Sequence, residues 1–243
     1  MGAAALLFNG AGGLMRFMRC AALLGLAALA ASPSAAQPYL SPAAAYVAPG
    51  QDLAGYRAWV AADPRHSIAL AAYSDYLIRA GVGDVVPIWQ LARTASDWHK
   101  CGQPAFEVPP PELWGNIVNS LRFVRDHVKP AVGAVEALSA YRNPTLNMCA
   151  KGAPGSSHQL NYGVDLVPLY PFDRRALMAR LCTVHARAGA SSDAGLGFYI
   201  GIRFHIDVWK YRVWGISAEE GGDQCAIALE RREDARKVPE RGN

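Results

Sequence analysis

The chain has 243 residues, of which 51% are hydrophobic and 18% are charged. This composition is typical of a globular protein and excludes an intrinsically disordered chain. Beyond residues 1–36 there is no run of about 18 apolar residues, which excludes a protein with several transmembrane helices. The formal net charge is +4 and includes no long block of lysine and arginine. We therefore expect no nucleic-acid partner.

The N-terminus has the order of features found in a secretory signal peptide. Two arginines precede an apolar stretch over residues 20–31, and small residues follow, with Ser34 and Ala36 suited to the −3 and −1 positions. We predict that residues 1–36 are a signal peptide, that cleavage precedes Gln37, and that the mature protein is periplasmic or extracellular without stable membrane insertion. A buried N-terminal helix is the alternative interpretation.

Residues 37–50 are rich in alanine and proline and predict a linker. A helical section over residues 51–105 follows, in which one helix is expected over 64–80 and a second over 87–100, each ended by a glycine. The side chains expected to be buried are Ile68, Ala72, Leu77 and Ile78 in the first helix and Ile88, Trp89, Leu91, Ala92 and Ala95 in the second. No motif in this section indicates a function.

Four prolines within residues 103–111 predict a rigid, non-helical joint, which is the best candidate for an internal domain boundary. The second domain is expected over residues 110–222. It opens with a helix that begins at Pro111 and ends before Pro130. The apolar residues of this helix recur at spacings of three and four: Leu113, Ile117, Leu121, Val124 and Val128.

Beyond Pro130 the pattern changes to short strands. They are predicted at 133–141, 163–167, 196–200, 203–208 and 211–214, with a loop over 145–157. Asp173 is suited to cap a helix that ends at Gly189. Helices followed by clustered short strands predict an α+β fold with a small antiparallel sheet. Residues 223–243 are expected to form a charged tail.

The cysteines favour disulfide bonds. Of the five, Cys20 lies in the predicted signal peptide, which leaves Cys101, Cys149, Cys182 and Cys225. An even number in an exported chain predicts two disulfides, and the sequence leaves all three pairings open. Four buried free thiols are the alternative. Zinc binding by these cysteines is disfavoured because no two of them lie within a short ligand spacing.

Two segments carry residues suited to metal chemistry. His158 and Asp165 are separated by seven positions across a turn of small residues, and His205 follows in a predicted strand. Two imidazoles and one carboxylate form a good ligand set for a zinc ion that keeps one coordination position for water. A zinc ion lowers the pKa of such a water molecule and makes hydroxide available at neutral pH.

These segments resemble the zinc D-Ala-D-Ala carboxypeptidase family, which also includes murein endopeptidases and has a hedgehog-like fold. The resemblance lies in Ser156-x-His158, in the Asp165 that follows, and in the strand with His205-x-Asp207. The stretch 139–144 is similar to the family's Ser-x-Tyr-Arg-x-Pro segment, and Arg212-Val213-Trp214 is similar to the end of the family's last strand. The resemblance covers residues 110–215, about half of the chain. It is to the branch of the family that has His-x-Asp in the last strand.

The resemblance implies an exported zinc peptidase that hydrolyses an amide bond next to a D-amino acid in peptidoglycan peptides, as a carboxypeptidase or an endopeptidase. It implies that His158, Asp165 and His205 bind Zn²⁺. Arg142 is expected to stabilise the developing oxyanion, Tyr141 to contact the substrate, and Ser156 to brace the loop or the substrate.

The chain departs from the family pattern at the general base. Many members have a glutamate three residues before the last histidine, where this chain has Ile202. Residues two apart in a strand share a face, so Arg203 and Asp207 are expected beside His205. Asp207 is then either the catalytic base or a residue that orients a ligand histidine. Arg203 either binds a substrate carboxylate or neutralises Asp207.

A smaller departure lies in the short segment before Asp165. Asn161 and Gly163 occupy positions where the family has a Gly-x-Ala arrangement, and the spacing from His158 to Asp165 is kept.

Two other functions are compatible with the residues. A metal-containing peptidoglycan-binding module without catalysis would explain the missing glutamate. A serine hydrolase using Ser157 and His158 is disfavoured, because adjacent residues rarely align for proton transfer and no nucleophile-elbow pattern is present. Trp209 and Trp214 are expected to fill a core or a sheet edge.

Overall fold

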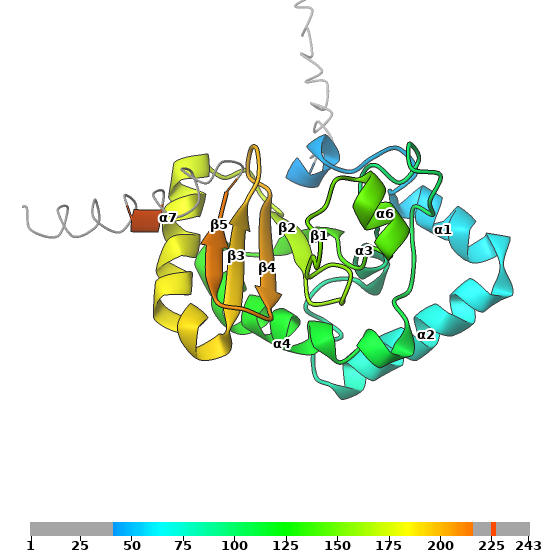
Figure 1. Cartoon of the computed structure of the whole chain (residues 1–243), viewed down its shortest axis with the longest axis horizontal. Coiled ribbons are helices and arrows are strands. Elements are labelled where there is room, and N and C mark those ends of the chain that lie inside the picture. The colour runs from blue at the N-terminus through cyan, green and yellow to red at the C-terminus, as the bar shows by residue number, and fades with distance from the viewer. Residues whose placement is uncertain (1–40, 216–224, 227–243) are drawn as a thin grey trace, which may run out of the picture. The chain divides into compact units, whose positions relative to one another are not determined.

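The computed structural model describes residues 41–215 and 225–226 of the chain (Figure 1). The predicted signal peptide, the first residues of the predicted linker and most of the predicted charged tail lie outside these residues. Within the described part, no helix is both long and apolar enough to cross a membrane.

A five-stranded sheet lies at the centre of the second half of the chain. Its spatial order is β1-β2-β4-β3-β5, and all neighbouring strands are antiparallel except β3 and β5. The bounds are β1 Val135–Ser139, β2 Val164–Pro168, β3 Ala194–Phe198, β4 Phe204–Val208 and β5 Arg212–Trp214. The predicted α+β class is confirmed. The parallel pair departs from the expected antiparallel sheet because β5 turns back after β4 and then pairs with β3.

The two faces of the sheet differ because side chains alternate along each strand. Leu166 of β2 and Ile206 of β4 point to one face and are buried in the main hydrophobic core. Asp165 and His205 point to the other face, where they lie directly opposite each other in the β2–β4 register. One face of the sheet therefore packs the core, and the other carries the polar residues singled out by the sequence.

Helices α4 and α7 cover the apolar face, and Figure 1 shows α4 crossing behind the strands. The helical bounds on this side are η2 Pro111–Leu113, α4 Asn116–Phe123, the π-helical segment η3 Val124–Val128, α5 Lys129–Val132, α7 Arg174–Val184, the π-helical segment η4 His185–Gly189 and η5 Ala190–Ser192. Asp173 caps α7 by accepting the Ala176 N–H at 2.9 Å, as predicted. The predicted stop before Pro130 is wrong, since α5 continues through this proline close to its N-terminus.

The helical section contains α1 (Leu53–Ala62), α2 (Pro64–Arg79) and α3 (Ile88–Leu91), which lie beyond β1 in Figure 1. The bounds predicted for α2 are confirmed to within one residue, but its predicted inward face is confirmed only at Leu77. Ile68 and Ile78 are 68% and 62% exposed, and the buried residues are Leu70, Tyr73 and Leu77. In this alanine-rich helix several faces are similarly apolar, so the spacing alone does not select one.

The second predicted helix of this section is much shorter than expected. After α3 the chain extends alongside the edge of β1. Arg93 forms an isolated β-bridge with Phe106, and the Arg93 carbonyl accepts the Ala140 N–H at 3.0 Å. The buried guanidinium of Arg93 also donates to Glu136 at 2.8 Å and to the Ala137 carbonyl at 2.7 Å. These non-local partners replace the hydrogen bonds that a continued helix would make.

Two further segments differ from their expected conformation. Residues 41–50, expected to be a linker, contain η1 (Pro42–Ala45) and pack through buried Ala43 against Leu138 and Val167. Residues 145–157, expected to be a loop, begin with α6 (Pro144–Cys149). The two predicted disulfides are present, as Cys101–Cys149 and Cys182–Cys225. Disulfides indicate an oxidising, exported environment.

Candidate metal centre

His158 lies in the loop before β2. One of its ring nitrogens makes a hydrogen bond, and the other has no hydrogen-bond partner among the described residues. Its Nδ1 is 2.5 Å from the Ala140 carbonyl, which can only accept, so Nδ1 carries the proton and Nε2 the lone pair. Burial, together with the guanidinium of Arg142, lowers the pKa of His158 to about 4. Nε2 is buried, has no hydrogen-bond partner among the described residues, and lies 3.3 Å from Asp165 Oδ1.

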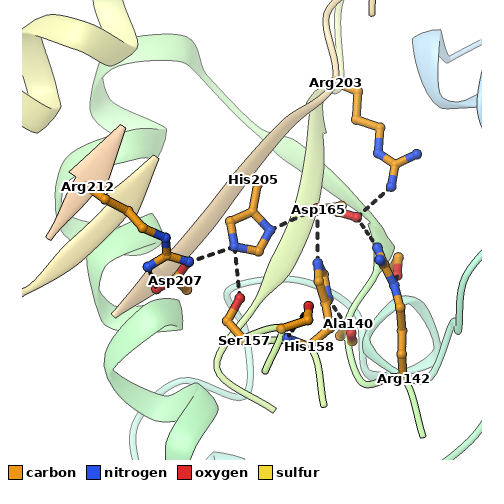
Figure 2. A network of polar contacts seen from close by, with 11 residues as sticks. Ala140, Arg142, Ser157, His158, Asp165, Arg203, His205, Asp207 and Arg212 are labelled. Atoms are coloured by element: carbon orange, nitrogen blue, oxygen red, sulfur yellow. Dashed lines mark hydrogen bonds and ion pairs between the residues drawn. The ribbon is translucent and has the colours of Figure 1, made fainter. Parts of the chain in front are cut away.

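Asp165 is fully buried on β2, and its two oxygens have different partners. Oδ2 accepts hydrogen bonds from Arg142 and from Arg203, each at 2.5 Å. Oδ1 faces the two histidines (Figure 2). Burial alone would raise the pKa of Asp165, but Arg203, His158 and Arg142 hold it well below its usual range. The carboxylate is therefore ionised, with one oxygen held by the arginines and the other directed at the imidazoles.

His205 of β4 lies between two carboxylates. Its Nδ1 is 3.0 Å from Asp165 Oδ1, and its Nε2 is 2.8 Å from Asp207 Oδ2. Burial acts to lower the pKa of His205, but the hydrogen bonds to Asp165 and Asp207 outweigh it and the pKa is raised. A metal ion bound at Nδ1 would displace the proton there and leave Nε2–H donating to Asp207.

The three residues fit a metal ion. Their candidate ligand atoms all lie within 4.8 Å of one another, and all three side chains are buried. Tetrahedral zinc with bonds of about 2.0 Å separates its ligand atoms by about 3.3 Å, close to the measured distances of 3.3 and 3.0 Å from Asp165 Oδ1 to the histidine nitrogens. A buried, unpartnered imidazole nitrogen is costly unless a ligand satisfies it. This group could therefore hold a metal ion.

Asp207 lies on the side of His205 away from Asp165. It accepts from His205 Nε2 and from Arg212, which contacts its two oxygens at 3.0 and 2.6 Å. Burial would raise the pKa of Asp207, but His205 and Arg212 lower it. Of the two roles open from the sequence, this contact favours orientation of a ligand histidine over proton transfer.

Two glycines of β3 leave room for this arrangement. A Cβ at Gly195 would lie 2.6 Å from Asp207 Oδ2, and one at Gly197 would lie 2.1 Å from the indole of Trp214. The Trp214 ring in turn lies 5.4 Å from the His205 ring. The Gly-x-Gly pattern of β3 therefore makes space for side chains around His205.

Ser157, weighed from the sequence only as the nucleophile of a serine hydrolase, contacts His205 rather than His158. Its Oγ is 3.2 Å from His205 Nε2. This nitrogen is closer to Asp207, at 2.8 Å, and a carboxylate can only accept. Because Nε2 donates to Asp207, it cannot also remove a proton from Ser157, which argues against a serine hydrolase.

The remaining predicted site residues are placed as follows. Arg142 is buried and donates from Nε to Ser139 Oγ at 3.0 Å, and its Nη1 makes no hydrogen bond with a described residue. Arg203 stacks on Tyr199 at 4.2 Å and pairs with Asp165, not with Asp207. Ser156 Oγ accepts the His158 N–H at 3.3 Å and so braces the loop. Tyr141 is buried and is absent from the cavity lining described next.

A cavity of about 770 Å³ opens onto the two histidines, and we call it the metal cavity. Its lining includes five cationic side chains, which are Arg142, Lys151, Arg203, Lys210 and Arg212. Asp97 is the one acidic side chain in the described lining. It comes from the helical section and no sequence pattern identified it. The disulfide Cys101–Cys149 joins the segment that carries Asp97 to the segment that carries Lys151.

Comparison of the chain with protein-family models, with curated proteins and with solved structures finds no match.

Proposed function

We propose that the protein is an exported zinc peptidase that hydrolyses an amide bond next to a D-amino acid in peptidoglycan peptides. The observation that carries the proposal is the buried, unpartnered Nε2 of His158, which faces Asp165 Oδ1 beside His205 at one cavity. The resemblance of the same residues to the zinc D-Ala-D-Ala carboxypeptidase family supplies the substrate class. The disulfides support export, and a periplasmic location is part of the proposal.

The residues of the metal cavity have separate tasks in this proposal. Zinc bound to the triad would lower the pKa of a water molecule and polarise the amide carbonyl. Arg142, with an uncommitted Nη1, stabilises negative charge that develops on the substrate oxygen. The exposed Lys151 and Lys210 attract a carboxylate of the peptide. Asp165 and Asp207 are held by arginines, so Asp97 is the carboxylate among the described residues of the cavity that remains to accept a proton.

Two measurements test the proposal together. The metal content of the purified protein is determined by mass spectrometry for wild type and for His158→Ala, with His99→Ala as a control at an exposed histidine. We expect about one zinc per chain in wild type and in His99→Ala, and none in His158→Ala. Purified muropeptides are then digested with the zinc-loaded protein. Release of free D-Ala identifies a carboxypeptidase, loss of cross-linked dimers an endopeptidase, and no product despite bound zinc refutes catalysis.

The second candidate is a metal-containing peptidoglycan-binding module without catalysis. It is favoured by Ile202 at the position of the family's glutamate and by the engagement of Asp207 with His205 and Arg212. This function predicts bound zinc and measurable peptide affinity without turnover. It also predicts that Asp207→Asn leaves the peptide affinity unchanged.

A further inference from the structure

A second hollow of about 540 Å³ shares one side chain with the metal cavity. Both are lined by Trp209, which follows β4 and is 43% exposed. The prediction that Trp209 fills a core is therefore wrong, because this partly exposed side chain lies between two concave regions. We call the region lined by Asn119, His127, Tyr162, Ser192, Asp193 and Trp209 the second hollow.

An aromatic stack forms the boundary between the two regions. The ring of Tyr162 lies parallel to the indole of Trp209, with an interplanar angle of 11° and a centroid distance of 5.9 Å. This oriented pair, with Trp209 exposed and Tyr162 half-buried, presents a flat apolar surface edged by polar groups, and such surfaces are stabilised by a ligand that covers them. The stack holds Trp209 in place without burying it.

The polar groups of the second hollow differ from those of the metal cavity. Asn119 and His127 offer donors, and Ser192 and Asp193 offer acceptors. The side chain of Asp193 makes no hydrogen bond or ion pair with a described residue. Its backbone adopts a left-handed conformation with φ +52°, which aspartate tolerates better than most residues. The second hollow therefore offers both donors and acceptors without an excess of cations.

The charges that line the second hollow nearly cancel. Asp126 pairs with Arg125 at 2.7 Å, and the two other charged side chains of the lining, Arg122 and Asp193, are opposite in sign. A ligand suited to this region is therefore neutral and rich in hydroxyl groups, and it has a flat C–H face for the indole. A saccharide has this combination, because one face of its ring presents C–H groups and its rim presents hydroxyls that both donate and accept.

We propose that the second hollow binds saccharide units, with Trp209 as the stacking surface. Since the metal cavity and the second hollow meet at the same indole, the saccharide is covalently attached to the peptide held in the metal cavity. The attachment rests on the proposed peptidase function, whereas saccharide binding does not. The natural substrate is then a peptide still joined to its glycan, rather than a free peptide.

Binding to the metal-free and to the zinc-loaded full-length mature protein is measured by calorimetry with two probes, tetra-N-acetylchitotetraose and cellotetraose. We expect at least one of them to bind, and we expect Trp209→Ala and His127→Ala each to weaken that binding about tenfold or more. The matched control is Tyr211→Ala, which removes an exposed ring stacked on His185 outside both concave regions. It is expected to bind the probe as wild type does.

Absence of binding by both probes, or binding that Trp209→Ala and His127→Ala leave intact, overturns the proposal. Equal weakening by Tyr211→Ala also overturns it, because the effect would then be a general loss of folded protein. A glycan-linked and a free peptide test the attachment. Wild type is expected to prefer the linked peptide, with this preference reduced about tenfold in Trp209→Ala. Saccharide binding without any hydrolysis refutes the peptidase and leaves the saccharide site standing.

Discussion

Replacing Asp207 by asparagine separates the two roles that the sequence left open for this residue. In the wild-type structure Asp207 Oδ2 accepts the His205 Nε2–H at 2.8 Å. The substitution keeps an oxygen that can accept this N–H but removes the negative charge. It also leaves Arg212 without the carboxylate that it contacts at 3.0 and 2.6 Å. If Asp207 orients His205 and raises its basicity, the loss appears in metal affinity rather than in the chemical step.

The structure sets the size of the expected effect. Partners that hold a metal-ligating histidine typically contribute 10–100-fold in metal affinity, equivalent to about 1.4–2.7 kcal/mol. Because a neutral acceptor remains at the same position, we expect Asp207→Asn to weaken zinc binding by about tenfold, at the lower end of this range. At saturating zinc, turnover should stay within about threefold of wild type.

Zinc affinity is measured by competition with a chromogenic chelator, and kcat is measured at saturating zinc. Asp193→Asn is the matched control, since it makes the same chemical change in an aspartate that lines only the second hollow. It should leave zinc affinity unchanged. Unaltered zinc affinity in Asp207→Asn together with a large, zinc-independent loss of kcat would show that Asp207 is the base, and the reasoning from its contact with His205 would be refuted.

Three other predictions concern the metal cavity and its walls. Asp97→Asn should lower kcat about a hundredfold at saturating zinc with zinc affinity unchanged, and near-normal turnover would exclude Asp97 as the proton acceptor. Replacing both Cys101 and Cys149 by serine opens a loop of 48 residues and should lower the free energy of unfolding by about 4 kcal/mol in urea titrations; equal stability would contradict this value. Chelation of the metal should lower the Tm by several degrees, reversibly on addition of zinc, whereas His158→Ala should show no zinc-dependent shift.

The strands were predictable because their signal is local. Alternation placed β2 and β4 within one or two residues of their observed bounds, and it placed His205 and Asp207 on one face. The pairing of β5 with β3 was not predictable, because a strand of three residues contains no information on which edge it joins. The predicted inward face of α2 failed at Ile68 for a related reason. Ile68 is as apolar as the residues of this helix that are buried, so its hydrophobicity did not show that it is exposed.

The site was predictable only as far as its ligands. The spacing of His158, Asp165 and His205 predicted a group that the structure brings together. The role of Asp207 depends on which nitrogen of His205 it contacts, and side-chain orientation is not encoded in spacing. Asp97 lies far from the motif in sequence and reaches the cavity only through tertiary packing and the Cys101–Cys149 disulfide.

The helical section, which has no readable motif, contributes to the geometry of the metal centre through the backbone. The Gln90 side chain accepts the Ala137 N–H at 3.0 Å, and the Arg93 carbonyl accepts the Ala140 N–H at 3.0 Å, so this section fixes the outer edge of β1 and the residues that follow it. The carbonyl of the same Ala140 accepts the proton on His158 Nδ1 and thereby directs the lone pair of Nε2 at Asp165. Because a shift of this edge would change the tautomer or the tilt of His158, the section without a motif supports a candidate metal ligand.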